Sequence, residues 1–434
     1  MAQFRKDTHQ YLPQETTIFE VVMLADQYGN LVGPANPSGV SVDAFGRARM
    51  SSPLTLFDSS LRYQDDARFN YANSATGSTI VYDANSSTVS LNVRSAVANS
   101  YVYRESSRVF SYQPGKSLHT IQSFCMAPAQ TGLRQRVGYF GSQNGVYLEL
   151  NGNTINFVIR SFSSGTVVED RVSQSSWNID TLDGTGPSLL TLDLTKTQLF
   201  WSDIEWLGVG TVRCGFVING QYIHCHSFHH SNLANTTYMT TACLPLRYEI
   251  ENINSMANNA QMNVICASIM SEGGYEVRGR NRTAGQLPNT SYTLTTAGVF
   301  YPVVSIRLKA ERPDAIVVPK TISLLGLFGN GTRIAYKLVE GGAVGNGTWT
   351  STGTDSSVQY NITANSIVGG TELDQGFLYV AQQSSAAVSM QDDIFRLQLG
   401  RNSFTNTNTT FTLAVAGAGA SDTCIGAINW MEIT

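Results

Sequence analysis

Thr211-Val-Arg-Cys-Gly-Phe-Val-Ile-Asn-Gly-Gln-Tyr-Ile-His-Cys-His-Ser-Phe228 carries the clearest structural signal in the chain. Two apolar, β-branched runs flank Asn219-Gly220, and a two-residue type I′ turn needs the positive φ values that Asn and Gly tolerate. The stretch therefore predicts an antiparallel hairpin. A two-residue turn fixes the register, which predicts three facing pairs: Ile218 with Gln221, Phe216 with Ile223, and Cys214 with Cys225.

Strand alternation predicts one apolar and one polar face for this hairpin. The apolar face would carry Val212, Cys214, Phe216, Ile218, Ile223 and Cys225. The polar face would carry Arg213, Tyr222, His224 and His226. Aromatic side chains here and elsewhere could line a sugar-binding groove, or they could be buried in a sandwich core; they are Trp177, Trp206, Tyr147 and Tyr222. The candidate glycan contacts are Trp177, Tyr222, His224 and His226.

Length and composition set the class of the protein. A chain of 434 residues is too long for one ordinary core, so two or three domains are expected. Charged residues make up only 14%, well below the usual quarter, which is typical of extracellular or virion β-proteins with hydroxyl- and amide-rich surfaces. A net charge of −4 provides no electrostatic footprint for nucleic acid or an anionic membrane.

The cysteines and the N-terminus predict synthesis in a reducing cytoplasm. Residues 1–7 contain no apolar signal-peptide region, and no run approaches the roughly 18 apolar residues of a membrane span. The six cysteines show no CxxC spacing, so buried thiols are expected. A cross-strand disulfide between Cys214 and Cys225 is the alternative.

Strand candidates recur every 8–12 residues between turn signals, and no long helical period is visible, which predicts an all-β fold. We expect four parts: an extended N-terminal arm over 1–50, a jelly-roll-like β-sandwich over 51–275, a linker over 276–290 and a second β-sandwich over 291–434. In the last part, Asn330-Gly331 predicts a hairpin that pairs Leu327 with Ile334 and Leu325 with Tyr336.

The arm contains one good strand candidate, and its apolar residues are Ile18, Val21, Val22 and Leu24. An unpaired strand exposes a row of N–H and C=O groups, so it tends to pair with another sheet edge. The arm is expected to dock onto another subunit, giving a homo-oligomer such as a trimer or a higher ring. Folding back onto its own sandwich, which leaves a monomer, is the alternative.

Residues that suggest chemistry all have structural explanations. His224 and His226 would share a strand face while Cys225 points the other way, so the three cannot chelate one metal ion. Asp180, Asp183 and Asp193 fit no defined calcium loop, and no nucleotide-binding motif occurs in a strand–helix context. The sequence therefore predicts neither metal nor cofactor.

Trp201-Ser-Asp-Ile-Glu205 resembles the Glu-x-Asp-x-Glu strand of laminarinase-type retaining glycosidases, which are concanavalin-like jelly rolls. In that motif the first Glu is the nucleophile and the last is the general acid/base, and the mechanism needs both carboxyls. Trp201 occupies the nucleophile position here, and only Asp203 and Glu205 match. The resemblance implies a related sheet without the enzymatic activity.

Several segments together resemble large virion structural proteins of marine tailed bacteriophages, of the kind found in cyanophages and pelagiphages. They span most of the chain: Phe19–Met23, Pro53–Asp58, Tyr112–Lys116, Arg136–Phe140, Trp177–Gly186, Trp206–Arg213, Leu244–Ile250 and Arg312–Pro319. The middle part is similar to laminin-G and concanavalin-type jelly rolls. The resemblance implies a particle component, assembled in the host bacterial cytoplasm and ending in the virion.

The sequence therefore predicts a non-enzymatic structural protein, placed in a fibre, the tail or neck, or a capsid-surface appendage. Its expected partners are other virion proteins, further copies of itself and a host-surface glycan contacted through exposed loops. A carbohydrate-binding adhesin that recognises a receptor is the alternative from another class. A glycan-degrading enzyme is the remote alternative.

Overall fold

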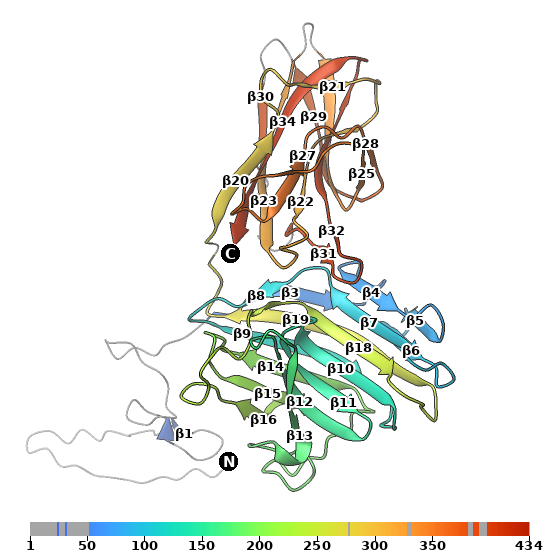
Figure 1. The fold of residues 1–434 in the computed structure, drawn as a ribbon, viewed down its shortest axis with the longest axis vertical. Coiled ribbons are helices and arrows are strands. Elements are labelled where there is room, and N and C mark those ends of the chain that lie inside the picture. The colour runs from blue at the N-terminus through green and yellow to red at the C-terminus, as the bar shows by residue number, and fades with distance from the viewer. Residues whose placement is uncertain are drawn as a thin grey trace, which may run out of the picture. The chain divides into compact units, whose positions relative to one another are not determined.

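The computed structural model describes residues 24–25, 31–32, 52–276, 278–327, 332–380, 385–389 and 397–433 (Figure 1). Across these ranges the chain is β-structure with a single 3₁₀ turn, η1 (Gln174–Ser176), and no α-helix. None of these residues therefore forms a helix of a length and hydropathy that could cross a bilayer. The chain divides into a unit of residues 1–52 and a compact unit of residues 53–434.

Only two short strands of the first unit are described, β1 (Leu24–Ala25) and β2 (Leu31–Val32), which pair antiparallel. Of the predicted assembly residues, Ile18, Val21 and Val22 lie outside the described residues. Leu24 is described only through its backbone, as the first residue of β1. The docking role of the arm stays a prediction.

A sandwich of two antiparallel sheets occupies residues 54–272. The seven-stranded sheet has the order β13-β12-β11-β10-β18-β7-β4. Its strands are β4 (Phe69–Asn73), β7 (Tyr101–Ser106), β10 (Leu133–Phe140), β11 (Gly145–Asn151), β12 (Thr154–Ser161), β13 (Val168–Ser173) and β18 (Leu246–Asn252). Strands distant in sequence are neighbours here, as when β10 pairs with both β11 and β18.

The eight-stranded sheet has the order β16-β15-β14-β9-β19-β6-β5, with β3 also beside β19. Its strands are β3 (Leu54–Ser60), β5 (Ser78–Asp83), β6 (Thr88–Val93), β9 (Ser117–Cys125), β14 (Gln198–Ile204), β15 (Val212–Ile218), β16 (Gln221–Phe228) and β19 (Ala260–Glu272). Alternate residues of both sheets meet in one core, where Phe157, Phe200 and Phe216 are fully buried. The predicted jelly-roll-like sandwich is confirmed.

The hairpin β15–β16 turns at Asn219 (φ 52°) and Gly220 (φ 75°), and the predicted pairs Ile218–Gln221 and Phe216–Ile223 are confirmed. The predicted pair Cys214–Cys225 is wrong. A β-bulge at Cys214/Gly215 pairs Gly215 with His224 and Cys214 with His226, so Cys225 is the extra residue.

The loop after η1 supplies the hydrogen bonds that the bulge removes from the ladder. The carbonyl of Cys225 accepts from the N–H groups of Ile179 at 3.1 Å and Asp180 at 3.0 Å. This compensates the bulged backbone, because a buried carbonyl without a partner is costly. All six cysteines are free, and Cys214, Cys225 and Cys424 are buried as predicted, whereas Cys125 and Cys243 are half-buried and Cys266 is exposed.

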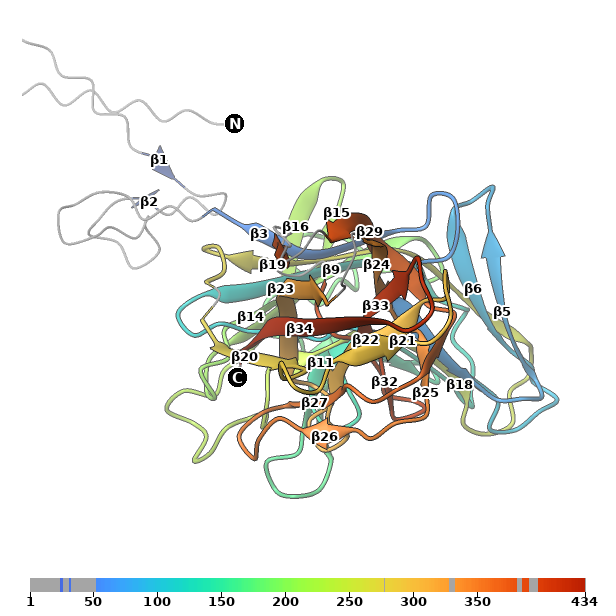
Figure 2. The same cartoon turned by 90° about the horizontal axis from the view of Figure 1, so that it is seen from above.

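A second sandwich follows. Its five-stranded sheet has the order β20-β34-β23-β30, with β21 beside β34, and its six-stranded sheet has the order β26-β27-β22-β33-β24-β29. Figure 2 shows this sandwich from above. The strands of the first sheet are β20 (Arg280–Gly285), β21 (Tyr292–Leu294), β23 (Ile316–Gly326), β30 (Ser385–Ser389) and β34 (Asp422–Ile433). Those of the second are β22 (Tyr301–Leu308), β24 (Thr332–Glu340), β26 (Thr350–Ser351), β27 (Val358–Asn361), β29 (Thr371–Val380) and β33 (Phe411–Gly417).

Two features of this sandwich differ from the sequence-based expectations. The predicted linker 276–290 contains β20, which pairs with β34. The predicted hairpin around Asn330-Gly331 is also wrong, because β23 pairs with β30 and β34 whereas β24 pairs with β29 and β33. Two strands with alternating apolar residues can pack face to face across a core or pair side by side in one sheet. The alternation alone therefore does not identify which strands pair.

Candidate functional site

Trp177, one of the four predicted glycan contacts, belongs to the core. Its side chain is 4% exposed and stacks on Phe157 with ring centroids 4.1 Å apart. Its indole N–H donates to the carbonyl of Val172 at 3.2 Å. The prediction for Trp177 is therefore wrong, because the segment after η1 folds this indole inward over the end of the sandwich core.

His226 is the second predicted contact that is buried, at 6% exposure. Its Nδ1 accepts a hydrogen bond from the backbone N–H of Asn178 at 3.2 Å, and its ring meets Phe228 edge-on at 4.5 Å. Burial, with the neighbouring His224 adding to it, lowers the pKa of His226 to about 4. The bulge at Cys225 changes the alternation of β16, which explains why the predicted polar face does not include His226.

Tyr222 and His224, the other two predicted contacts, lie together on the outer face of the eight-stranded sheet with Trp201 of β14 and His119 of β9. The Trp201 ring is 5.8 Å from those of Tyr222 and His224 and 5.9 Å from that of His119. We call His119, Trp201, Tyr222 and His224 the aromatic patch. Tyr222 is 53% exposed, whereas Trp201 is 6% exposed.

Gly215 makes room for this patch. A Cβ at Gly215 would lie 2.7 Å from the indole of Trp201 and 2.0 Å from the carbonyl of Ile223, so the indole lies directly over the glycine backbone. The position that holds the nucleophile in laminarinase-type motifs therefore holds a packed indole. Asp203 accepts a hydrogen bond from the hydroxyl of Ser117, and Glu205 is exposed beyond the end of β14.

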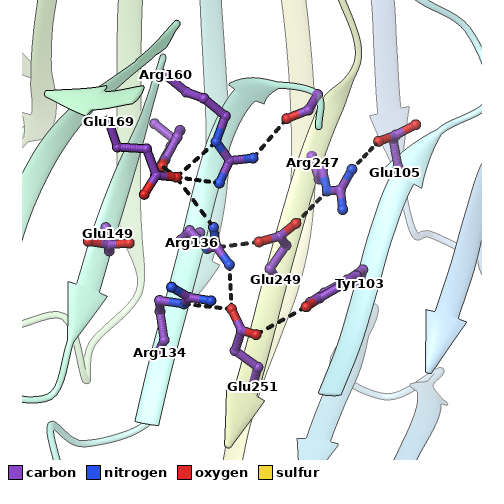
Figure 3. Close-up of polar contacts among 12 residues, drawn as sticks. Tyr103, Glu105, Arg134, Arg136, Glu149, Arg160, Glu169, Arg247, Glu249 and Glu251 are labelled. Carbon is purple, nitrogen blue, oxygen red and sulfur yellow. Dashed lines mark hydrogen bonds and ion pairs between the residues drawn. The ribbon is translucent and has the colours of Figure 1, made fainter. Parts of the chain in front are cut away.

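A second cluster covers the outer face of the seven-stranded sheet (Figure 3). Alternate residues of its strands project there instead of pointing into the core, and most of them are Arg, Glu or Tyr. We call these residues the charged layer: Tyr103, Glu105, Arg134, Arg136, Tyr147, Glu149, Arg160, Glu169, Arg171, Arg247, Glu249 and Glu251. Most are buried although they are charged, which requires each to be paired.

Arg136 is the centre of the charged layer. Its guanidinium forms ion pairs with Glu249, at 2.8 Å from Nε to Oε2, and with Glu251. The contact with Glu249 is an ion pair whose atoms are not aligned as a hydrogen bond. Glu251 also accepts from Arg134 Nε at 2.6 Å and from the hydroxyl of Tyr103 at 3.0 Å. Burial raises the pKa of Glu251, but its hydrogen bonds and the charges of these two arginines outweigh burial and lower it overall.

Glu169 is the centre of a second group at the β13 end of the sheet. It accepts hydrogen bonds from the Tyr147 hydroxyl at 2.7 Å and from Arg160 Nε and Nη2 at 2.9 and 2.6 Å. Burial acts to raise the pKa of Glu169, but these hydrogen bonds and the neighbouring arginine charges lower it to about 2. Glu149, which is fully buried, pairs with Arg171 at 2.7 Å.

Glu105 of β7 links the charged layer to residues of the later part of the chain. It accepts from Arg247 Nη1 and from Arg401 Nη1, both at 2.8 Å, and from the hydroxyl of Ser403 at 2.6 Å. Arg401 also pairs with Asp314 at 2.6 Å. A small cavity of about 190 Å³ adjoins these side chains, and the charges on its wall are already matched to one another.

This arrangement is unsuited to acid–base chemistry. Each glutamate of the charged layer contacts at least one arginine. A glycosidase needs one carboxylic acid with a raised pKa, whereas the pKa values of Glu169 and Glu251 are shifted downward. Within the described ranges no group of three or more His, Cys, Asp or Glu side chains is arranged to hold a metal ion.

The sequence-based reasoning missed the charged layer. Leu246–Ile250 is a strand candidate in the sequence and the structure extends this strand to Asn252, but the charges of Arg247, Glu249 and Glu251 at every second position were not interpreted. Arg134 and Arg136 on β10 repeat the same period. Charge at period two on adjacent strands, with apolar residues between, is the signal that could have revealed a paired ionic face.

No family model matches the chain, and no curated protein is a significant match. Solved structures with similar folds include a GH16 protein of the Bacteroides ovatus mixed linkage glucan PUL, at 10% identity, covering 49% of this chain and 99% of its own, with a TM-score of 0.34. The CBM2 module of the evolved Dit protein of Lactobacillus casei BL23 phage J-1 is similar at 6% identity, covering 53% and 100%, with a TM-score of 0.34.

A legume lectin-like domain from Entamoeba histolytica is similar at 8% identity, covering 49% of this chain and 91% of its own, with a TM-score of 0.29. These likenesses fall on about half of the chain and are too weak to carry a functional argument. The fold assignment rests on the two sandwiches themselves.

Proposed function

We propose that the protein is a non-enzymatic structural component of a tailed-phage virion. The observation that supports this most is the charged layer, in which the carboxylates of one whole sheet face are bound by the protein's own arginines. A face of this kind adds geometric specificity to a sheet and leaves no free acid–base pair for catalysis. The resemblance to virion proteins of marine tailed phages supplies the particle context.

The proposal is tested by locating the chain in purified particles. Cryo-EM of intact virions should show the two sandwiches at a repeated position, and peptide mass spectrometry should find the chain at a fixed ratio to the major capsid protein. Recovery only from the soluble lysate, with none in gradient-purified particles, would reject the structural role.

The absence of catalysis has its own test. Host polysaccharide incubated with the protein should release no reducing ends. Release that disappears in Glu205→Gln and persists in a Glu276→Gln control would identify an enzyme, because Glu205 is the exposed carboxylate that matches the general acid/base position of the laminarinase-type motif.

Assembly through the arm is part of the proposal. Low surface charge and the apolar strand candidate of the arm favour a homo-oligomer, in which that segment pairs with a sheet edge of another copy. Deleting residues 1–45 should lower the mass measured by sedimentation to that of a monomer. A full-length protein that is already monomeric at high concentration would exclude the arm as the assembly device.

A carbohydrate-binding adhesin is the second candidate function, and the aromatic patch is the observation that favours it. Tyr222 presents an exposed ring beside the packed Trp201 and the imidazole of His119, a surface that suits the apolar face of a sugar ring. On a glycan array, Tyr222→Ala should abolish any signal that depends on this patch. Tyr63→Ala, which removes a ring that is 84% exposed elsewhere, is the matched control.

A further inference from the structure

A polar cleft of about 630 Å³, larger than the cavity at Glu105 and open to solvent, is lined mainly by residues of the second sandwich and also by Asn70 of β4 in the first. Its wall includes Arg307, Trp349, Gln359, Asn402, Asn406 and Asn408, with backbone from Gly341 to Val344. This volume falls in the range of sites that bind small molecules, roughly 300–1,000 Å³. None of the described residues that line it is acidic.

Arg307 and Gln359 are cross-strand neighbours on β22 and β27. The Nε and Nη2 atoms of Arg307 both donate to the side-chain oxygen of Gln359 at 3.3 Å. The guanidinium also lies over the ring of Trp349, 4.1 Å from its centroid. The three side chains form one cluster on the outer face of the sheet, since Ile306, Leu308 and Val358 beside them point into the core.

Arg307 forms no salt bridge with any residue that the structure describes, which sets it apart from the arginines of the charged layer. Burial lowers its pKa, so the surroundings disfavour its charge, and no carboxylate among the described residues compensates. A guanidinium is a fork of donors that matches a carboxylate in geometry and charge. The two long bonds to Gln359 use part of this capacity and leave Nη1 without a described partner.

The remaining wall supplies hydrogen-bonding groups held in fixed positions. Asn408 is anchored through its amide, which donates to the carbonyl of Leu308 at 2.9 Å. The side-chain oxygen of Asn402 accepts from the N–H of Phe404 at 3.0 Å, which leaves its NH₂ for another partner. Thr410 donates to the carbonyl of Gly342 at 2.7 Å and fixes the glycine turn. A ligand that covers this wall must form hydrogen bonds with its polar groups in place of water, because burying polar groups without partners is costly.

We propose that this cleft binds an acidic saccharide, whose carboxylate pairs with Arg307, whose ring packs against Trp349 and whose hydroxyls bond to the amides around them. An acidic sugar ring offers one partner for each kind of group on the wall: its charge for the guanidinium, its apolar face for the indole and its hydroxyls for the amides. An apolar ligand would leave the amides unpaired. The proposal goes beyond the structural role and does not depend on it, because binding is measured on the isolated protein.

The test compares trigalacturonic acid with its fully methyl-esterified form, in which an uncharged methyl ester replaces each carboxylate on the same sugar backbone. Isothermal titration with full-length protein should show the acid binding at least about tenfold more tightly than the ester, because a hydrogen bond to a charged group is strong enough for such a factor. The difference should shrink in high salt, as expected for an exposed ion pair.

Variants separate the parts of the site. Arg307→Gln should remove the preference for the acid and leave the weak binding of the ester, whereas Trp349→Ala should remove both. Arg333→Gln is the matched control, because Arg333 is exposed on β24 in the same sandwich and outside the cleft. Circular dichroism and the melting temperature confirm that each variant is folded.

Two results would overturn the proposal. Equal affinity for acid and ester would exclude recognition of the carboxylate, and full binding by Trp349→Ala would place the ligand elsewhere. Absence of binding to both probes at millimolar concentration would reject the saccharide site itself, while leaving the detection of the chain in virions unaffected.

Discussion

Arg136 is the residue on which the charged layer depends most, because it pairs with Glu249 and Glu251 while being only 5% exposed. Removing one partner from a buried ion pair leaves the other charge without compensation. Arg136→Met should therefore lower the free energy of unfolding of the first sandwich by about 3–5 kcal/mol, measured by urea denaturation.

Arg278→Met is the control for that experiment. Arg278 and its partner Glu276 are both largely exposed, so the same substitution should change stability by no more than about 1 kcal/mol. Equal effects of the two substitutions would show that burial does not set the strength of these pairs.

Glu169 gives the charged layer a defined response to acid. Its pKa in the folded protein is about 2, below the ordinary value of 4.5, so the unfolded chain binds more protons between these values and stability falls as the pH is lowered through that window. The stabilisation is fully present above about pH 4.5. The free energy of unfolding should decline less steeply from pH 4.5 to 2 in Glu169→Gln than in the wild type. Parallel curves for the two proteins would contradict the assignment.

At the scale of the element, the hairpin β15–β16 tests two roles of glycine. Gly220 needs a positive φ of 75° but has open space around a would-be Cβ, whereas a Cβ at Gly215 would lie 2.0 Å from the carbonyl of Ile223. Gly220→Ala should lower the free energy of unfolding by about 1–2 kcal/mol, because alanine is strained at this positive φ. Gly215→Ala should cost about 3 kcal/mol or more, because backbone and Trp201 must both move. Thermal denaturation measures both, and a reversed order would be inconsistent with this packing.

The same hairpin shows what its sequence could and could not reveal. Asn219-Gly220 determines the turn, and the turn determines the two pairs next to it, so Ile218–Gln221 and Phe216–Ile223 were predictable. The bulge at Cys225 depends on N–H groups from Ile179 and Asp180, which are distant in sequence. No local pattern contains that contact, so the exposure of His226 and the pairing of Cys214 were predicted wrongly.

Among larger features, the all-β class and the first sandwich followed from strand spacing, but the partners of β23 and β24 did not. Apolar alternation reports which face of a strand is buried and does not report which neighbour pairs with it. Trp177 was misplaced for a similar reason, since an aromatic side chain fits a core and a binding surface equally well until its neighbours are known.

At the scale of the whole molecule, Arg401 connects regions far apart in the chain through Glu105 and Asp314. Residues 53–434 form one compact unit, so calorimetry should show the two sandwiches unfolding in one transition. Arg401→Met should lower the free energy of unfolding by about 1–3 kcal/mol, a moderate loss because Glu105 keeps Arg247 as a partner. The substitution should also split that transition, because it removes the ion pairs that join Glu105 and Asp314 through Arg401. Two separate transitions in the wild type would contradict this coupling.

Burial of the charged layer also determines how the protein responds to dissolved ions. At about 1 M salt the Debye length is roughly 3 Å, so interactions among exposed charges are almost fully screened, whereas buried pairs are screened much less. The chain has 28 Lys and Arg and 32 Asp and Glu residues, and ten of these 60 belong to the charged layer. The free energy of unfolding of the first sandwich should consequently change little between dilute buffer and about 1 M salt.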